Sequence, residues 1–249
     1  MAAAAKSRAD ALLVARGLAE NRSKAQALVM AGLVFSGERR IDKPGQMLAP
    51  DLPLDVRGRP HPWVSRGGQK LDHGLDRFGV SVDGAVCLDV GASTGGFTDV
   101  LLTRGAARVY AVDVGHGQLD WKLRNDPRVA VLERTNARHL STGHIPAPVD
   151  MVVCDASFIG LETVLPAPLA LTRPGAHLIA LIKPQFEVGR ARVGKGGVVR
   201  DPALHREVCD RLSAWLAARP GWTALGVCES PILGPEGNRE FLMGGRRDA

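Results

Sequence analysis

The region from residue 86 onward alternates short apolar runs rich in Val, Ile and Leu with longer stretches of helical periodicity. The runs typical of strands are residues 86–90, 109–112, 129–132, 151–154, 178–182 and 225–228. The helical stretches between them are residues 97–104, 118–125, 161–171 and 203–218. Such alternation indicates a parallel sheet with helices on both faces. We therefore expect an α/β fold whose ligand binds at the carboxyl ends of the strands, where the strand order reverses.

The chain of 249 residues is long enough to bury one full-sized core and to carry a small additional module. Its formal net charge of +6 favours a polyanionic partner, although many basic proteins bind no nucleic acid. Aromatic residues make up only 4% of the chain, which argues against stacking platforms of Phe and Tyr as the main nucleic-acid contact.

The four cysteines are far apart and form no C-x-x-C pair: Cys87, Cys154, Cys209 and Cys228. This spacing predicts neither a zinc site nor a disulfide framework, so we expect reduced thiols and no bound metal. No segment approaches the roughly 18 uncharged apolar residues that a membrane-spanning helix needs. We expect a soluble, cytoplasmic protein with no membrane partner, acting as a monomer.

The first 60 residues have a different pattern. Helical spacing is expected over residues 8–19 and again from the polar break at Asn21 to Gly32, followed by strands at 33–35 and 52–56. Ten of these residues are Lys or Arg and six are acidic, so most of the excess positive charge lies here. Two helices and a small sheet indicate a compact α+β unit.

This segment resembles the alpha-L RNA-binding module of a ribosomal small-subunit protein, pseudouridine synthases and tyrosyl-tRNA synthetases. The matching pattern is Arg8-x-Asp10-x-x-Leu13, then Arg22-Ser23-x-Ala25-x-x-Leu28-Val29-x-x-Gly32-x-Val34, then Lys43-Pro44-Gly45. The resemblance implies RNA binding by Arg8, Arg22, Ser23, Lys24, Arg39 and Lys43. One departure is Ser36-Gly37 where the family has Asn-Gly, and both are acceptable turn dipeptides. A capping subdomain with a solvated charged face is the alternative.

Two prolines within Arg59-Pro60-His61-Pro62-Trp63 disfavour both a helix and a central strand. We therefore expect an alpha-L domain over 1–59, a linker over 60–64, a catalytic domain over 65–245 and a tail over 246–249. Trp63 is expected to pack between the modules, with stacking on a base as the alternative.

The first strand of the larger domain leads into a glycine-rich loop, Asp89-Val90-Gly91-Ala92-Ser93-Thr94-Gly95-Gly96-Phe97. Ser93 stands where a dinucleotide fingerprint would need its second glycine, which counts against NAD and FAD. A strand-end acid followed by this bend suits S-adenosylmethionine, because the methionyl ammonium needs a carboxylate and its carboxylate can accept loop N–H groups. Asp113, at the end of the second strand, is placed to hold the two ribose hydroxyls.

The sequence therefore predicts a cofactor site made of Asp89, Gly91, Ala92, Ser93, Thr94, Gly95, Gly96, Phe97, Asp113, Val114 and Asp155. A glycine-rich turn with a purely structural purpose is one alternative. A nicotinamide oxidoreductase is the other.

Polar residues follow the fourth and fifth predicted strands, in Cys154-Asp155-Ala156-Ser157-Phe158 and in Ile182-Lys183-Pro184-Gln185-Phe186-Glu187. Two further polar segments are Ser65-Arg66-Gly67-Gly68-Gln69-Lys70-Leu71, which opens a helix, and Gly237-Asn238-Arg239-Glu240-Phe241, which enters a last strand. These motifs resemble the TlyA family of ribosomal-RNA 2′-O-methyltransferases, whose catalytic domain is similar to the FtsJ heat-shock methyltransferase. The resemblance covers nearly the whole chain.

The resemblance implies a Rossmann-like class I methyltransferase sheet, S-adenosylmethionine as cofactor, and methylation of a cytidine ribose 2′-hydroxyl in ribosomal RNA of one or both subunits. It also implies a Lys-Asp-Lys-Glu tetrad, and the matching residues are Lys70, Asp155, Lys183 and Glu240. A ribose hydroxyl is a poor nucleophile, and a lysine that burial and a neighbouring ammonium favour in its neutral form can take its proton. Lys183 is the candidate base, Lys70 would hold the hydroxyl, and the two carboxylates would orient the amines. No metal is needed.

The segment 188–197 is glycine-rich and basic and directly follows the Lys183 motif. We expect Arg190, Arg192 and Lys195, together with Arg66, to contact RNA, with this segment acting either as a lid or as a disordered surface loop. A non-catalytic RNA-binding assembly factor remains the alternative function. Relatives labelled haemolysins would require a membrane-active segment, and none is visible in the sequence.

Overall fold

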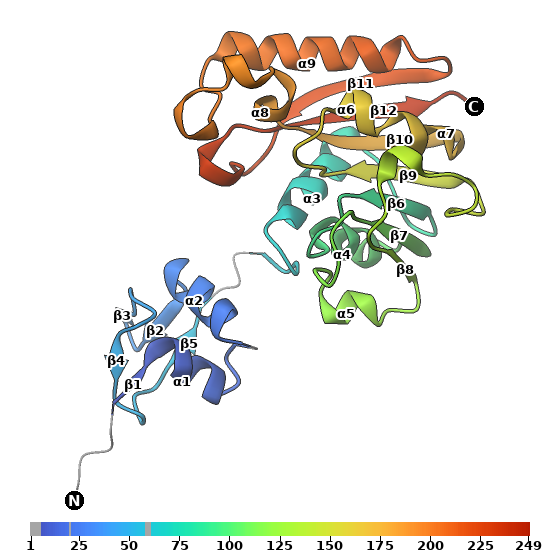
Figure 1. The fold of residues 1–249 in the computed structure, drawn as a ribbon. Helices are drawn as coiled ribbons and strands as arrows, with labels where there is room; N and C mark the ends of the chain where they lie inside the picture. The colour runs from blue at the N-terminus through green and yellow to red at the C-terminus, as the bar shows by residue number, and fades with distance from the viewer. Residues whose placement is uncertain (1–5, 20, 58–60) are drawn as a thin grey trace, which may run out of the picture. The chain divides into compact units, whose positions relative to one another are not determined.

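The computed structural model describes residues 6–19, 21–57 and 61–249 and consists of two compact units, Met1–Pro62 and Trp63–Ala249 (Figure 1). The division lies within the segment 60–64 that the sequence predicts as a linker, of which Pro60 lies outside the described residues. Each unit has its own hydrophobic core.

The smaller unit packs two helices against short strands. The helices are α1 (Ala9–Ala15) and α2 (Arg22–Met30). The strands are β1 (Ser7–Arg8), β2 (Val34–Ser36), β3 (Arg39–Arg40), β4 (Met47–Leu48) and β5 (Asp55–Val56), paired as β1-β4 and as β3-β2-β5. Helix α1 ends four residues before the predicted end, because Gly17 adopts a φ of 68° that breaks the helix. The core of the smaller unit includes Leu13, Ala25 and Val34.

The larger unit is built on a seven-stranded sheet in the order β11-β12-β10-β9-β6-β7-β8. Its strands are β6 (Val86–Val90), β7 (Arg108–Val112), β8 (Val129–Leu132), β9 (Val149–Cys154), β10 (Thr172–Ile182), β11 (Trp222–Glu229) and β12 (Phe241–Arg247). Its α-helices are α3 (Gly67–Phe78), α4 (Gly96–Thr103), α5 (Trp121–Arg124), α6 (Leu161–Val164), α7 (Pro166–Ala170), α8 (Pro184–Glu187) and α9 (Pro202–Ala217).

Helices cover both faces of this sheet, which confirms the predicted α/β architecture (Figure 1). On one face α3, α4 and α5 bury Leu71, Val100 and Leu123 against alternate residues of the strands. On the other face α6, α7 and α9 do the same with Leu161 and Leu212 among others. Because the chain runs from β6 outward to β7 and β8, and later from β9 outward to β10, the strand order reverses between β6 and β9. This is where a ligand is expected to bind.

The sheet is mostly parallel, as predicted, but one edge contains an antiparallel strand. Strand β12 lies between β10 and β11 and runs antiparallel to both. The connection from β11 to β12 is too short to hold the crossover that parallel neighbours need, so the two strands pair as a hairpin. The strand also continues to Arg247, which pairs with Trp222, so part of the segment 246–249 belongs to the sheet and not to a tail.

The helix expected over 161–171 is two short helices. Pro166 has no N–H to donate and is the first residue of α7, so α6 ends at Val164. The helix expected over 118–125 is reduced to the single turn α5, which Asp120 caps by accepting a hydrogen bond from the Lys122 N–H.

Candidate active site

The glycine-rich loop joins β6 to α4 and passes close to its neighbours at two glycines. Gly91 has a φ of 82°, and a Cβ there would lie 3.0 Å from the backbone of Ala156. Gly95 has a φ of 97°, and a Cβ there would overlap the side chain of Leu123 in α5. Both positions therefore require glycine, for conformation and for space.

One cavity of about 430 Å³ opens at the carboxyl ends of β6, β7 and β9, a volume suited to a small organic ligand. Five of the predicted cofactor residues line it: Gly91, Ser93, Asp113, Val114 and Asp155. The Asp113 carboxylate accepts hydrogen bonds from the N–H groups of Ser93 (2.8 Å) and Gly115 (2.7 Å). Asp113 thereby fixes the loop, and each of its oxygens keeps a further lone pair for a ligand hydroxyl.

Asp89 lies beneath the loop. It lines neither this cavity nor a second cavity that adjoins it. It is fully buried, its Oδ2 accepts a 2.6 Å hydrogen bond from Thr98 Oγ1, and its Oδ1 has no hydrogen-bond partner among the residues that the structure describes. Burial, with smaller contributions from the charges of Asp155 and Asp113, raises the pKa of Asp89 to about 7. A buried carboxylate oxygen without a donor is chemically suited to a cationic group such as the methionyl ammonium.

This pKa leads to a prediction about pH. A cationic ligand needs Asp89 ionised, so we expect affinity for S-adenosylhomocysteine to rise from about pH 6 to about pH 8. Asp89→Asn should abolish that rise and weaken binding roughly 10- to 100-fold at the higher pH. Titration calorimetry at the two pH values measures both effects, and an unchanged pH dependence in the variant would contradict the assignment.

The same pKa shift predicts the opposite change in stability. Folding raises the pKa of Asp89 from 3.8 to about 7. The protonated carboxyl therefore makes its full contribution to stability below about pH 4, and this contribution is lost as the pH rises through 7. Asp89→Asn carries no charge to bury, so the ligand-free variant should melt at a higher temperature than the natural chain at pH 8 and show little difference at pH 4. Thermal unfolding at both pH values provides the check.

A second cavity of about 270 Å³ adjoins the first, and Gly91, Ser93, Asp155 and Ser157 line both. Its remaining lining residues are Ser65, Arg66, Gly67, Lys70, Ala92, Thr94, Gly96, Phe97 and Lys183. Lys70 and Lys183, the two predicted catalytic lysines, thus both line the second cavity, which meets the first at Asp155 and Ser157.

The four predicted catalytic residues form two ion pairs. Lys183 Nζ lies 2.6 Å from Asp155 Oδ1, where the ends of β9 and β10 come together. Lys70 Nζ, on α3, lies 2.6 Å from Glu240 Oε2 at the start of β12. Lys70 is 5% exposed and Glu240 1%, so this second pair is removed from water. Glu240 lines neither cavity and acts on the site through Lys70.

The Glu240 carboxylate occupies space that a glycine leaves open. A Cβ at Gly234 would overlap the carboxylate, so only glycine fits there. Asn238, two residues before Glu240, holds the end of the basic segment: its Oδ1 accepts from Val199 N (3.1 Å) and its Nδ2 donates to Gly197 O (3.0 Å).

The basic segment is ordered into two short turns, η2 (Arg190–Arg192) and η3 (Lys195–Gly197). Arg190 and Lys195 are exposed. Arg192 donates to the Glu207 carboxylate at 2.6 and 2.8 Å and to Val188 O at 2.9 Å, so much of its hydrogen-bonding capacity is already used. Arg192, which the sequence predicts as an RNA contact, is therefore already engaged with other residues of the protein.

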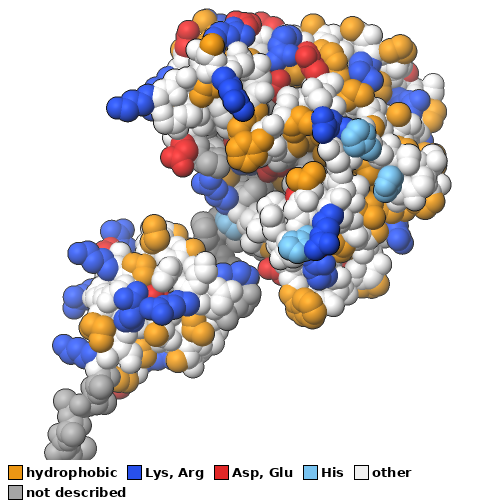
Figure 2. Space-filling view, viewed as in Figure 1, with side chains coloured by type: hydrophobic (Ala, Val, Ile, Leu, Met, Phe, Trp, Pro, Cys, Tyr) orange, Lys and Arg blue, Asp and Glu red, His pale blue; other side chains and the backbone are white. Residues whose placement is uncertain are grey.

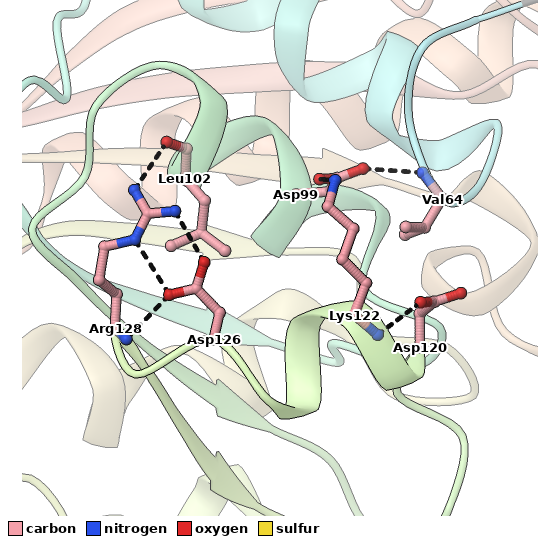
Figure 3. Close-up of polar contacts among 7 residues, drawn as sticks. All are labelled: Val64, Asp99, Leu102, Asp120, Lys122, Asp126 and Arg128. Atoms are coloured by element: carbon pink, nitrogen blue, oxygen red, sulfur yellow. Dashed lines mark hydrogen bonds and ion pairs between the residues drawn. The ribbon is translucent and has the colours of Figure 1, made fainter.

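Asp99 of α4 ties together the segments that surround the glycine-rich loop (Figure 3). Its Oδ2 accepts a 2.9 Å hydrogen bond from Val64 N, just before the helix that carries Lys70, and its Oδ1 pairs with Lys122 Nζ of α5 at 3.2 Å. In the same view Arg128 pairs with Asp126 and donates to Leu102 O, which fixes the chain after α5. Trp63 is partly buried and packs against Gly68 of α3 and the core of the larger unit.

In the smaller unit, Lys and Arg side chains crowd the visible surface (Figure 2). Arg8 and Arg22 both bind the buried Asp10 carboxylate, at 2.9 and 3.1 Å, and the Arg8 guanidinium holds the pKa of Asp10 well below its usual range. The other predicted RNA-binding residues of this unit, Ser23, Lys24, Arg39 and Lys43, are exposed.

Several cavity residues were missed by the sequence analysis. Thr135, Asn136, Ala137 and Arg138 follow β8 and line the first cavity, as do Gln118, Phe158 and Ile159. The rule that ligands bind beyond the carboxyl ends of strands could have identified the first four, because β8 is the third strand from the reversal point. Within the ranges that the structure describes, no cluster of His, Cys, Asp and Glu could hold a metal ion, and no helix is long and apolar enough to span a membrane.

Comparison with known proteins agrees with this geometry. The FtsJ-like methyltransferase family matches residues 63–247, and the S4 domain family matches residues 7–52. The 16S/23S rRNA (cytidine-2'-O)-methyltransferase TlyA of Mycobacterium tuberculosis is 50% identical over 241 residues, which cover 96% of this chain and 90% of that protein.

Two further relatives are similar over most of their length. Hemolysin A of Brachyspira hyodysenteriae is 38% identical over 94% of this chain and 98% of that protein. The solved structure of a candidate hemolysin from Streptococcus thermophilus is 42% identical, with a TM-score of 0.77 over 98% of this chain and 89% of that one. The similarity therefore includes both units.

Proposed function

The chain belongs to the FtsJ-like methyltransferase family, with an S4 domain preceding the methyltransferase domain, and from this premise we propose that it methylates a cytidine ribose 2′-hydroxyl in ribosomal RNA. The observation that carries the proposal is the Lys183–Asp155 pair, which lies where the first cavity meets the polar second cavity. The nucleotide and the RNA are suggested by the printed name of the TlyA relative.

S-adenosylmethionine is the proposed cofactor. Asp113 would hold its ribose hydroxyls, the N–H groups of Thr94 and Gly96 its carboxylate, and Asp89, beneath the loop, its ammonium. When bound, it supplies a methyl group on a sulfonium that is already a good leaving group. The residues of the chain therefore need to position and deprotonate the attacking oxygen.

Lys183 is the proposed general base, taking the proton of the 2′-hydroxyl as that oxygen attacks. The Asp155 carboxylate forms an ion pair with the amine at 2.6 Å, and its backbone carbonyl accepts a hydrogen bond from the amine at 3.1 Å. Lys70 would donate to the same hydroxyl, with Glu240 fixing its direction. Lys70 lines the second cavity and Glu240 does not, so this buried pair places a positive charge at the site while its countercharge stays outside the cavity.

RNA binding is assigned to the S4 domain and to the basic residues of the second cavity and the segment after it. Arg8, Arg22, Ser23, Lys24, Arg39 and Lys43 would contact phosphates from the S4 domain, and Arg66, Arg190, Arg192 and Lys195 from the methyltransferase domain. One chain supplies all four catalytic residues, so we propose that it works as a monomer, and in the cytoplasm, where ribosomal subunits are found.

The test uses unmodified small and large ribosomal subunits, incubated separately with the protein and methyl-labelled cofactor. We expect label on one or a few cytidine riboses, located by nuclease digestion and mass spectrometry. Label on a base, or none on either subunit, would overturn the proposal. Unmethylated subunits that nevertheless bind the protein tightly would favour the assembly-factor alternative.

A further inference from the structure

Ser157 lies at the junction of the two cavities and lines both. It follows β9 by three residues, its side chain is exposed, and its Oγ is 2.8 Å from Lys183 Nζ. The next residue, Phe158, has a φ of 64°, an unusual conformation for a bulky side chain, and its ring packs on Phe186 with centroids 4.9 Å apart. Ser157 is therefore held toward Lys183 by a turn that the neighbouring rings support.

Lys183 Nζ has three oxygen neighbours in reach. These are Asp155 Oδ1 at 2.6 Å, the Asp155 carbonyl at 3.1 Å and Ser157 Oγ at 2.8 Å. An ammonium has three N–H donors and no acceptor, so it can donate to the Asp155 carbonyl and to Ser157 Oγ while its charge pairs with Asp155 Oδ1, which has no hydrogen-bond partner among the described residues. This arrangement describes the protonated lysine, which is the state after the reaction.

The neutral amine that starts the reaction has two N–H donors and one lone pair. An ionised carboxylate and a backbone carbonyl can only accept, so neither Asp155 group can face the lone pair favourably. A hydroxyl both donates and accepts. Ser157 is thus the one of these three partners that suits both protonation states of Lys183.

We propose that Ser157 is a positioning residue for the methyl transfer, an inference that rests on the proposed function. Its hydroxyl donates to the lone pair of neutral Lys183 and so directs that lone pair into the junction of the cavities. When RNA binds, the 2′-hydroxyl takes the place of the serine donor, which its exposure leaves free to rotate away. The O–CH₃ bond then forms as the CH₃–S bond breaks, and the 2′-hydroxyl proton passes to Lys183, whose ammonium again donates to Ser157.

The experiment compares Ser157→Ala and Ser157→Thr in the full-length chain. We expect the alanine variant to lower kcat on ribosomal subunits about tenfold, the effect of one hydrogen bond in the reacting state, with KM for the subunits unchanged. The threonine variant keeps the hydroxyl and should restore kcat to within about threefold of the natural chain. Ser141→Ala removes an exposed hydroxyl that forms a hydrogen bond with His144 and lines neither cavity, and is the matched control, expected to have no effect.

A kcat for Ser157→Ala within about twofold of the natural chain would overturn the inference, as would a threonine variant as slow as the alanine variant. A raised KM with unchanged kcat would instead make Ser157 an RNA contact and would also overturn it. Binding of S-adenosylhomocysteine and the thermal midpoint, measured on each variant, identify any loss of folding. If the natural chain itself transfers no methyl group, the proposed function fails before Ser157 is tested.

Discussion

Lys183→Met is expected to slow methyl transfer about a thousandfold while leaving the affinity for S-adenosylhomocysteine and for ribosomal subunits almost unchanged. Methionine keeps the length and most of the volume of the side chain but has no lone pair that can take the 2′-hydroxyl proton. Its neighbours Asp155 and Ser157 line the cavities, where water can satisfy the groups that lose Nζ. Single-turnover rates with saturating protein measure the chemical step directly.

The matched control is Lys6→Met. Lys6 is exposed, lines neither cavity, and is not among the residues proposed to bind RNA, so its removal should leave the rate within about twofold. A Lys183→Met variant that retained more than about a tenth of the natural rate would rule out Lys183 as the base.

Glu240→Gln is expected to have the largest effect on stability, lowering the free energy of unfolding by about 3 kcal/mol. The substitution leaves the Lys70 ammonium buried without its countercharge, because Glu240 Oε2 is its partner at 2.6 Å and both side chains are almost wholly inaccessible. All four tryptophans lie in the unit Trp63–Ala249, so denaturant unfolding followed by tryptophan fluorescence reports on this unit alone.

Two comparisons distinguish this cause from a general weakness of β12. Glu229→Gln breaks an exposed pair with Arg239, which lies just before β12, and should cost no more than about 0.5 kcal/mol. The double variant Lys70→Met with Glu240→Gln removes the uncompensated charge and should recover much of the loss. If the double variant were less stable than Glu240→Gln alone, burial of the lysine charge would not be the reason.

The architecture of the larger unit could be predicted because short-range sequence patterns determine its strands and long helices. Each strand is a short apolar run and each long helix has a clear period, so the Asp155 and Lys183 motifs could be placed at strand ends before any coordinates. The approach of these two ends follows from parallel pairing of β9 with β10. Lys70 and Glu240 are different, since nothing in their local sequence indicates contact across 170 residues, and only the family resemblance joined them.

Features that depend on tertiary packing were missed. The antiparallel placement of β12 depends on which edge of the sheet is free, and that is not encoded in the strand itself. The two-residue strands of the smaller unit are too short to show a period. The sequence identifies Ser157 only as part of the motif around Asp155. Its proposed role depends on the position of its hydroxyl next to Lys183, which the sequence does not show.

The interior position of β12 also has a consequence during protein synthesis. Strand β12 follows β11 along the chain but lies between it and β10, so a nascent chain that has reached only residue 240 leaves both of those strands with an unpaired edge. Such edges invite pairing with other chains and recognition by chaperones. The hairpin that completes the sheet also brings Glu240 onto Lys70, so pairing of these edges and formation of the buried ion pair both depend on β12.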